Sequence, residues 1–545
     1  MKSSAETILV RWSIRWGWLL IWLGFVAVAV STRSLWPIDE TRYATVAWEM
    51  WQNGQWLVPH LNGAPYPHKP PMLFWLMQMG WALFGVNDLW PRLIAPLAGV
   101  ASALLTRRLA RRLWPADARI AELVPWLLLF GLYWAGFHSM LMFDALMALW
   151  TVLALTGLWQ AMARPRLGFA VVGIALGLGL LTKGPIILLF VLPPALLAPL
   201  WHPAWPGWRI WGAGLVRGLV IMALMALVWA MPAVLFGGKG YAADLLWRQS
   251  AGRALESFAH RRPWWWYLPI LPLMLLPWSL FPSVYRAGVT AVSRVATDRG
   301  VRFCLATLLP GLLLCSMISG KQPHYLLPLF PVLTLLLACG LTASQGRFSS
   351  RPMAVVLAFF VLVLTVAPLW LRLQGHGSWV VEISPLWGLA LVPVVMFFWW
   401  LPPAGSLRQV PLLGALMAAL LVFAHGSIIR EAQLRFDLRE VSRTLGALER
   451  GGHPLAFVGT YRGQFQFLGR LKQVPTLLKD HEAARAWATR HPEGVVIDEV
   501  DHERDCAAPP SILCRPYRGH YLVVRESSQL HGGAPADTAV VGGSM

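Results

Sequence analysis

The stretch that decides the fold runs from Trp36 to Pro71 and reads WPIDETRYATVAWEMWQNGQWLVPHLNGAPYPHKPP. It carries more polar and charged side chains than almost any other part of the first 430 residues. It also directly follows an apolar run, near 10–30, that is long enough to cross a bilayer. Asp-Glu-Thr-Arg and His-Lys-Pro-Pro are thereby placed at a membrane surface, where charge is costly and usually functional.

The composition of the chain is that of a membrane protein. Hydrophobic residues make up 57% of its 545 residues and charged residues only 13%, against roughly 25% charged in soluble domains. The 32 tryptophans suit helix ends that lie at the level of the lipid headgroups. The first 30 residues have a basic start and an apolar run but no small-residue cleavage site, so we interpret them as a retained first helix.

The net charge of +20 does not indicate a nucleic-acid partner. Lys and Arg concentrate in the cytoplasmic loops of membrane proteins, where anionic lipid attracts them. No soluble basic domain is visible in the sequence. We therefore expect membrane lipids, and not nucleic acid, to be the partners of this charge.

Thirteen apolar runs predict a polytopic α-helical membrane protein with thirteen transmembrane helices. They lie near 10–30, 88–108, 120–136, 139–160, 167–182, 184–201, 210–236, 264–285, 302–319, 325–343, 352–373, 385–402 and 409–429. The segment 71–85 is too short for a span and is expected to be an interfacial or re-entrant helix. With the N-terminus inside, the arginines of the loops after the second, fourth, eighth and tenth spans fall on the cytoplasmic side. The odd number of spans then puts the C-terminal region on the outer side.

The charges that remain on the outer face are functional candidates, because the positive-inside rule does not require them there. They and their neighbours are Asp39, Glu40, Arg42, Tyr43, His68, Lys69, Asp144, Lys183, Lys321 and Tyr325, together with Arg253 and His260 of the basic loop 237–263. The carboxylates can orient a nucleophile, and the cations can bind phosphate. This combination predicts a phosphate-bearing lipid substrate.

Several of these side chains also have a purely structural interpretation. Asp39 suits the N-cap of an interfacial helix, and Lys69 can lie along apolar surface with its ammonium group in water. A lone Asp in a membrane helix, such as Asp144, usually faces an interior or a cavity. Lys183 precedes Gly-Pro, which breaks the helix and leaves backbone groups that must face protein or water, so its functional interpretation is favoured.

The composition changes from about Ile429. Amphipathic patterns at 434–451 and 481–491 predict helices, and PLAFVGTY, GVVIDEV and HYLVVRE predict strands. We expect a small α/β domain over 430–526 on the periplasmic side, followed by a disordered Gly- and Ala-rich tail at 527–545. A disulfide between Cys506 and Cys514 is plausible there, because disulfides persist in oxidising compartments.

The motif PIDETRYATVAWEMWQNGQWLVPHLNGAPYPHKPPMLFWL resembles the first outer loop of the lipid A aminoarabinose transferases and their relatives among bacterial GT-C glycosyltransferases. The family pattern is Asp-Glu-x-Arg-Tyr-Ala, Gly-x-Trp, Pro-x-x-Asn-Gly and Tyr-x-x-Lys-Pro-Pro, and nearly all of it is present. The likeness extends to LLTKGPI, PWWWY and SGKQPHYLLPLFP. It implies a GT-C transmembrane domain over 1–429, with juxtamembrane helices in 31–87 and a catalytic-face loop at 237–263, and a small periplasmic domain.

The resemblance implies transfer of a sugar, 4-amino-4-deoxy-L-arabinose in the named family, from undecaprenyl phosphate to lipid A on the periplasmic face of the inner membrane. The candidate catalytic residues are then Asp39, Glu40 and Asp144. The donor phosphate would be held by Lys69, Arg253 and Tyr325, with Lys321, Lys183, Arg42 and Tyr43 as further members of that site.

Two positions depart from the family pattern. His68 stands where the lipid A enzymes usually have Glu, and Gln249-Ser250 stand where Glu-His often precedes the loop arginine. The Glu and Glu-His of the family are associated with a metal ion. Because this chain has other residues at those positions, the sequence does not require a cofactor. A zinc ion held by His68 and His260 stays open, because imidazole is a good zinc ligand.

Two other functions stay open on the sequence alone. One is a related GT-C transferase that uses another polyprenyl-phosphate sugar and a glycan or protein acceptor. The other is a flippase for a polyprenyl-linked sugar. Simple transport would be expected to leave a pair of broken helices in two repeat halves, and the sequence contains no such internal repeat.

Overall fold

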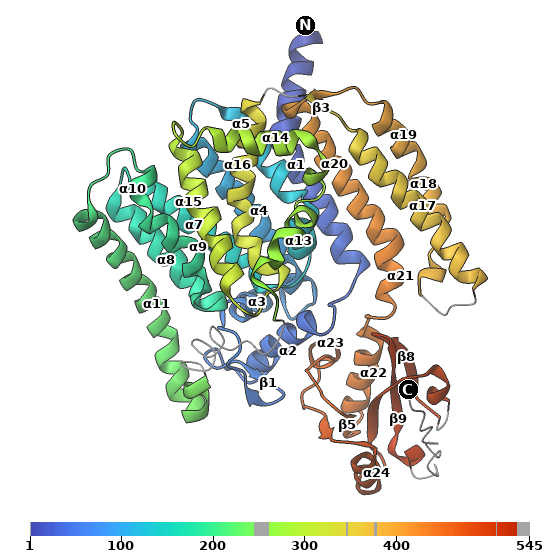
Figure 1. Cartoon of the computed structure of the whole chain (residues 1–545). Coiled ribbons are helices and arrows are strands. Elements are labelled where there is room, and N and C mark those ends of the chain that lie inside the picture. The colour runs from blue at the N-terminus through green and yellow to red at the C-terminus, as the bar shows by residue number, and fades with distance from the viewer. Residues whose placement is uncertain (1, 245–260, 345–346, 375–378, 508–509, 531–545) are drawn as a thin grey trace, which may run out of the picture. The chain divides into compact units, whose positions relative to one another are not determined.

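The computed structural model of the chain describes residues 2–244, 261–344, 347–374, 379–507 and 510–530 (Figure 1). The chain divides into two compact units. The first unit comprises Met1–Thr32, Gly54–Pro59 and Pro65–Glu431, and the second comprises Arg33–Asn53, His60–Ala64 and Ala432–Met545. The sequence places the domain boundary at 429–430 and assigns 31–87 to the membrane domain. It did not predict that Arg33–Asn53 belongs to the second unit.

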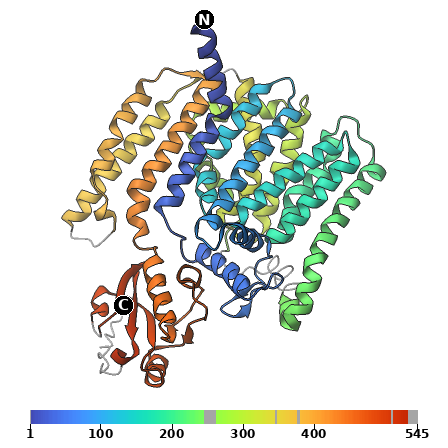
Figure 2. The same cartoon turned by 180° about the vertical axis from the view of Figure 1, so that it is seen from behind.

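The first unit is a bundle of helices, seen from opposite sides in Figures 1 and 2. Its longer helices are α1 (Lys2–Thr32), α3 (Met72–Phe84), α4 (Leu89–Leu113), α5 (Ala118–Leu129), α7 (Phe143–Ala161), α8 (Pro165–Lys183), α11 (Trp208–Ala243), α14 (Pro282–Ser293), α15 (Arg299–Met317), α16 (Phe330–Ala343), α17 (Arg351–Leu373) and α20 (Ser406–Ala424). Shorter helices are α6 (Leu132–His138), α9 (Leu188–Leu196), α10 (Ala198–Trp201), α13 (Tyr267–Met274), α18 (Leu386–Ala390) and α19 (Val392–Trp400). Helices suit a bilayer because they satisfy their own backbone hydrogen bonds.

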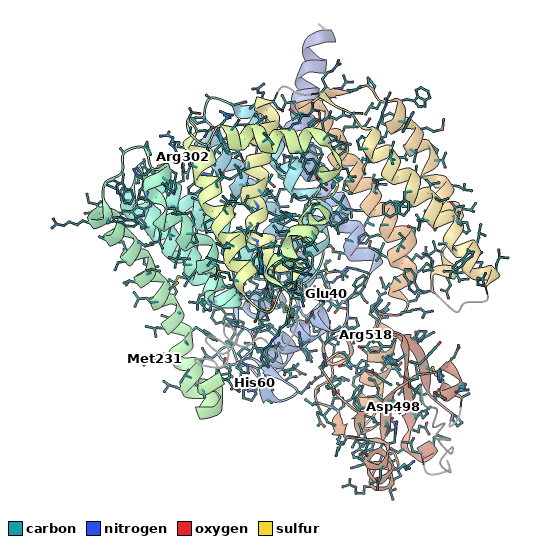
Figure 3. All side chains as sticks on the ribbon, in the orientation of Figure 1. Glu40, His60, Met231, Arg302, Asp498 and Arg518 are labelled. Atoms are coloured by element: carbon teal, nitrogen blue, oxygen red, sulfur yellow. A yellow bond between two sulfur atoms is a disulfide. The ribbon has the colours of Figure 1, made fainter. Side chains whose placement is uncertain are left out.

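The bundle has the apolar exterior that a lipid environment requires. Among the described residues, nine helices are long and apolar enough to cross a membrane, and the pair α5 and α6, bent by 63°, would make a tenth. Shorter apolar helices cover Met72–Phe84, Pro185–Leu196 and Leu386–Trp400. Met231 on α11 is labelled in Figure 3 and is 64% exposed, as expected for a lipid-facing side chain. The chain is therefore a multi-pass membrane protein, while the number thirteen stays a prediction.

The span expected at 264–285 does not form as one helix. The segment folds instead into α13, a short 3-10 turn at Trp278–Leu280 and the start of α14. Pro272, Pro277 and Pro282 explain the breaks, because proline removes a backbone donor and clashes with the preceding turn. The Trp278 indole is buried here and donates to the Leu127 carbonyl at 2.8 Å, so the broken segment is anchored to α5.

The hairpin of α7 and α8 is held close by small residues. A Cβ added at Gly168 would lie 2.4 Å from Ala161 Cα, so only glycine permits this approach of the two helices. On the far side of α8, a Cβ at Gly173 would lie 2.6 Å from the Gly218 carbonyl oxygen of α11. Close packing through small residues is a usual means of association for membrane helices. It fixes how α7 and α8 lie against each other, and hence which side chains meet at the end of the hairpin.

The second unit contains a mixed five-stranded sheet of order β6-β5-β7-β9-β8. The strands are β5 (Leu455–Val458), β6 (Thr476–Leu478), β7 (Val495–Val500), β8 (Leu513–Tyr517) and β9 (His520–Glu526), with helices α22 (Arg439–Arg450), α23 (Gln466–Gly469) and α24 (His481–Arg490). β5 is parallel to β6 and β7, whereas β9 is antiparallel to β7 and β8. The sequence predicted β5, β7, β9, α22 and α24. It missed β6 and β8, which are an edge strand of three residues and an edge strand interrupted by Pro516.

The helix α2 (Asp39–Gln52) belongs to the second unit because its side chains bond to the backbone of the C-terminal region. The Thr45 hydroxyl donates to the Gly463 carbonyl at 2.5 Å, and the Trp48 indole donates to the Leu471 carbonyl at 2.9 Å. The Arg470 guanidinium lies 5.7 Å from the centre of the Trp48 ring. The motif of the first outer loop therefore also carries the residues that dock α2 on the second unit.

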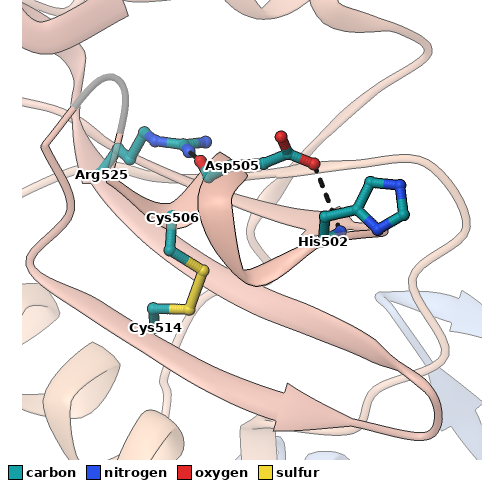
Figure 4. The surroundings of a disulfide bond; sticks show 5 residues. All are labelled: His502, Asp505, Cys506, Cys514 and Arg525. Carbon is teal, nitrogen blue, oxygen red and sulfur yellow. Dashed lines mark hydrogen bonds between the residues drawn. A yellow bond between two sulfur atoms is a disulfide. The ribbon is translucent and has the colours of Figure 1, made fainter. Parts of the chain in front are cut away.

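A disulfide joins Cys506 to Cys514, as the sequence suggested (Figure 4). It connects a short 3-10 turn, Glu503–Cys506, to β8. In the same turn the backbone N–H of His502 donates to the Asp505 carboxylate at 3.3 Å, and Arg525 donates to the Asp505 carbonyl. The bond thus ties the edge of the sheet to a polar turn beside it.

Replacing Gly463 with Ala is expected to loosen the docking of α2. Gly463 has φ +74, and an added Cβ would lie 2.8 Å from Thr45 Cγ2 and 2.9 Å from Leu61 Cδ1. Overpacking of this kind costs about 1–3 kcal/mol. Gly459→Ala is the control, because Gly459 has φ +93 but nothing lies within 4 Å of its added Cβ. Hydrogen exchange of α2 in the full-length chain should rise clearly more for Gly463→Ala, and equal rates in both variants would contradict this docking.

Candidate active site

A buried acid and a buried cation meet at the end of the α7–α8 hairpin. Asp144 lies in the first turn of α7, and Lys183 is the last residue of α8. The helix ends there because Gly184 adopts φ 78 and Pro185 follows. Lys183 Nζ lies 2.6 Å from Asp144 Oδ1, and the two side chains are 11% and 5% exposed. The sequence singled out both residues separately, and the structure brings them together.

Four more side chains surround this pair and complete what we term the Asp144 cluster: Lys69, Phe143, His324 and Tyr325. His324 and Tyr325 come from the 3-10 turn η5 (Pro323–Leu329) that leads into α16. His324 Nε2 lies 4.0 Å from Asp144 Oδ2, and Lys183 Nζ lies 4.5 Å from the centre of the Tyr325 ring. Three segments distant in sequence from Asp144 thus converge on its carboxylate.

Lys69 supplies the second ammonium group of the cluster. Its Nζ lies 5.4 Å from the centre of the Phe143 ring, and its charge acts favourably on Asp144. Asp144 therefore faces two ammonium groups, and the cluster keeps a net positive charge even with His324 neutral. A net positive pocket lined by aromatic rings suits the phosphate of an amphiphilic ligand.

Lys321 has a different environment from the one expected for a phosphate ligand. It is 3% exposed, and its Nζ donates to the Arg262 carbonyl at 3.0 Å and to the Ile318 carbonyl at 2.5 Å. Burial lowers the pKa of its ammonium group. The segment 261–262 also pairs with 319–320 through backbone contacts. The Lys321 ammonium group therefore joins two loop segments.

Asp39 and Glu40 are adjacent in sequence but differ in environment. The Asp39 carboxylate is 58% exposed and pairs with Arg42, one turn along α2. Glu40, labelled in Figure 3, is buried and accepts two hydrogen bonds from Arg33, at 2.5 and 3.1 Å, and one from the Trp36 N–H at 2.8 Å. Glu40 thus fixes the turn that precedes α2, whereas Asp39 is accessible for chemistry.

Arg42 and Tyr43 follow Asp39 on α2, within the second unit. The Arg42 guanidinium lies 5.4 Å from the centre of the Tyr43 ring, and Tyr43 is only 6% exposed. Arg42 pairs with Asp39 and therefore helps to orient the Asp39 carboxylate. Both residues therefore support α2 and its first turn.

Glu49 is a buried acid that sequence reasoning missed. Its two carboxylate oxygens accept from the backbone N–H groups of Asn62 and Gly63, at 2.8 and 3.0 Å. Burial raises the pKa of this carboxyl group, against the effect of those two hydrogen bonds. Asn62 has φ 56 and Gly63 has φ 75, the left-handed backbone that Asn and Gly favour in turns. The Glu49 carboxylate therefore stabilises the Asn-Gly turn of the Pro-x-x-Asn-Gly motif through these two N–H groups. Glu49 and Arg33 are both charged residues on an outer segment, where the positive-inside rule does not explain them. This pattern in the sequence could have identified both residues.

The remaining predicted site residues are only partly described. Arg253 and His260 lie outside the described residues. The ring of His68 packs edge-on against Tyr66, with 5.0 Å between the ring centres. Within the part of the chain that the structure describes, there is no group of three His, Cys, Asp or Glu side chains that could hold a metal ion. The zinc site at His68 and His260 therefore stays a prediction.

The fold matches that of solved membrane glycosyltransferases. The chain superimposes on ArnT from Cupriavidus metallidurans bound to undecaprenyl phosphate with a TM-score of 0.71 at 19% identity, covering 93% of this chain and 98% of that chain. The family model for dolichyl-phosphate-mannose-protein mannosyltransferases matches residues 68–236. This likeness shows that the chain has the fold of the GT-C glycosyltransferases.

Comparison with curated sequences gives the family within this class. The chain is 32% identical over 406 residues to undecaprenyl phosphate-α-4-amino-4-deoxy-L-arabinose arabinosyl transferase 1 of Pseudomonas fluorescens, covering 72% of this chain and 69% of the relative. It is 37% identical over 333 residues to the corresponding transferase of Pseudomonas paraeruginosa, covering 59% of this chain and 58% of the relative. The chain belongs to the undecaprenyl phosphate-aminoarabinose arabinosyl transferase family.

Breaking the Asp144–Lys183 pair is expected to destabilise the first unit more than removing both charges. Lys183→Met leaves a buried carboxylate without its nearest partner, which costs about 3–5 kcal/mol. The double variant Lys183→Met/Asp144→Leu removes that unpaired charge and should recover much of the loss. Thermal unfolding of the full-length chain in detergent measures the difference. A double variant less stable than Lys183→Met would contradict a direct pairing.

Proposed function

We propose that this chain transfers 4-amino-4-deoxy-L-arabinose from undecaprenyl phosphate to a phosphate group of lipid A, on the periplasmic side of the inner membrane. The observation that carries the proposal is the Asp144 cluster, in which two ammonium groups, each beside an aromatic ring, act on one buried carboxylate. The names of the relatives support this donor and this sugar. The positive-inside distribution of arginines supports the side of the membrane.

The reaction replaces one phosphate ester of the sugar by another. An oxygen of the acceptor phosphate attacks the anomeric carbon of the sugar and forms a new C–O bond. The C–O bond to undecaprenyl phosphate breaks, and its electron pair leaves with the phosphate oxygen. The acceptor phosphate is already ionised, so the enzyme needs little general-base assistance. Its main task is to stabilise the negative charge that develops on the leaving phosphate.

The Asp144 cluster can provide this stabilisation. Lys69 is the ammonium group that we assign to the leaving phosphate, with the Tyr325 hydroxyl as a further donor and Arg253 as the guanidinium that the family resemblance adds. Asp144 and Lys183 act as a positioning pair. The bond to Asp144 holds Lys183 against the Tyr325 ring, and the charges of Asp144 and Lys69 attract each other.

We assign the accessible carboxylate Asp39 to the sugar and acceptor. It can bind the amino group of the sugar, orient the acceptor, or support positive charge on the sugar ring in the transition state. Arg42 and Glu40 then have supporting roles, since one orients Asp39 and the other fixes the turn before it. We place Lys321 outside phosphate binding, because its ammonium group is bonded to two backbone carbonyls.

The experiment that tests the proposed function is a mass spectrum of lipid A from cells that carry or lack this gene. Lipid A should carry aminoarabinose only when the gene is present. Unchanged lipid A, together with a new modification on a glycan or protein, would instead identify a related transferase with another acceptor.

Asp39→Asn is expected to remove most of the sugar-transfer activity without unfolding the chain. The Asp39–Arg42 pair is exposed, so its loss should change the free energy of unfolding by less than about 1 kcal/mol. Loss of a positioned catalytic carboxylate should lower the rate at least about a hundredfold. Glu40→Gln is the comparison, because it weakens the buried contacts of Glu40 with Arg33 and Trp36 and should lower stability. Full transfer by Asp39→Asn would exclude the assigned role.

Lys69→Ala is expected to weaken the binding of undecaprenyl phosphate by about tenfold to a hundredfold, the value of one hydrogen bond to a charged group. Lys321→Ala is the matched control, because it also removes one ammonium group from a loop of the first unit. That variant should lose stability and keep its affinity for the lipid. Native mass spectrometry with undecaprenyl phosphate measures both affinities. Equal weakening in the two variants would mean that only overall charge matters.

A further inference from the structure

A second group of charged side chains lies at the opposite end of the first unit from the Asp144 cluster. Arg107, Arg108 and Arg111 are near the end of α4, and Arg15 is on α1. In Figure 1 the N-terminus and α5 are at the top of the helices, whereas α3, which follows Lys69, is at the bottom. The chain passes from the arginine end to the Asp144 end through α5 and α6. The two groups therefore face opposite sides of the membrane.

These arginines line a cavity of about 330 Å³. Its other lining residues are Trp16 of α1 and Leu104 of α4. Arg108 and Arg111 are exposed at the rim, while Arg107 is only 4% exposed. The cavity thus has a charged mouth, a buried guanidinium group and an apolar wall.

Arg107 is the residue in this cavity that most directly indicates a ligand. Its guanidinium lies 5.1 Å from the centre of the Trp16 ring, and its Nε and Nη2 atoms are buried with no hydrogen-bond partner among the described residues. The charges of Arg111 and Arg15 oppose that of Arg107, and Glu122 acts in its favour. No salt bridge joins Arg107 to an acid in the described part of the chain. A buried cation with unpaired donors is costly unless an anion accepts from it.

The cavity continues into apolar surface on both helices. Trp16, Leu20 and Leu23 on α1 are 37%, 59% and 51% exposed. Leu104 and Leu97 on α4 are 41% and 51% exposed. Residues spaced by three, four or seven positions lie on one face of a helix, so each set forms a track that leads from the cavity toward the middle of the bilayer. An anion with attached acyl chains fits this surface better than a free anion does.

We propose that this cavity binds the phosphate headgroup of an anionic phospholipid of the cytoplasmic leaflet. The phosphate oxygens accept from Nε and Nη2 of Arg107 and are approached by Arg108, Arg111 and Arg15. The acyl chains lie along the tracks of α1 and α4. The bound lipid joins the first helix to the rest of the bundle. This site is separate from the donor site and does not depend on the proposed function.

The test compares lipid binding by the delipidated full-length protein and two matched double variants. Arg108→Ala/Arg111→Ala removes two exposed charges from the rim of the cavity. Arg164→Ala/Arg166→Ala removes two exposed charges at the start of α8, outside the cavity. Each protein is titrated with phosphatidylglycerol, phosphatidylcholine or inorganic phosphate. Native mass spectrometry reports the bound lipid, and the midpoint of thermal unfolding reports its effect on the fold.

The unmodified protein should bind phosphatidylglycerol more tightly than phosphatidylcholine and be stabilised by it. The rim variant should lose on the order of thirtyfold in affinity for phosphatidylglycerol, as about two basic contacts with an anionic headgroup would give. The α8 variant should keep the affinity of the unmodified protein. Equal binding of the two lipids, or an equal loss in both variants, would overturn the proposal. Stabilisation by inorganic phosphate as large as that by phosphatidylglycerol would overturn the assignment to a lipid.

Discussion

The ion pair between Asp144 and Lys183 is the interaction on which the rest of the site depends. Burying either charge alone at an apolar helix end would cost free energy. The direct contact between the two groups offsets that cost. The glycine-mediated approach of α7 and α8 sets the register that brings them together. Within the Asp144 cluster Lys183 lies against the Tyr325 ring, and the charge of Lys69 on another loop acts favourably on Asp144. A hydrophobic hairpin thereby carries a cluster of net positive charge, to which we assign the donor phosphate.

The first outer loop serves both units of the chain. Its end at Lys69 belongs to the first unit, whereas α2 with Asp39 belongs to the second. Thr45 and Trp48 dock α2 on the C-terminal region, and Glu40 and Glu49 fix the segments at its two ends. The C-terminal region therefore has a direct structural role in supporting the carboxylate that we assign to the sugar and acceptor.

The sequence was sufficient to predict the membrane class and most of the long helices, and it singled out Asp39, Lys69, Asp144 and Lys183 as candidate site residues. Those predictions rest on local patterns, namely apolar runs and charges that topology does not explain. Pairings between distant segments could not be predicted. The Lys183–Asp144 contact depends on the register of two helices, and the bonds of Lys321 depend on how two loops meet.

Other features of the structure also differ from the prediction made from the sequence. The segment 264–285 has the hydropathy of a span, but five prolines between 263 and 282 break it into short helices. The edge strands β6 and β8 are too short or too irregular to give an alternating pattern. Asp39 and Glu40 are adjacent acidic residues that the sequence pattern does not distinguish. Only their burial in the structure shows that Glu40 is structural and that Asp39 is accessible.

The most direct test of the account is the reaction of the purified chain in liposomes that contain undecaprenyl-phosphate-aminoarabinose and lipid A. Both products are measured at once by mass spectrometry. Aminoarabinose should appear on lipid A in the same amount as undecaprenyl phosphate is released. Movement of the sugar-linked lipid across the bilayer without its consumption would contradict it.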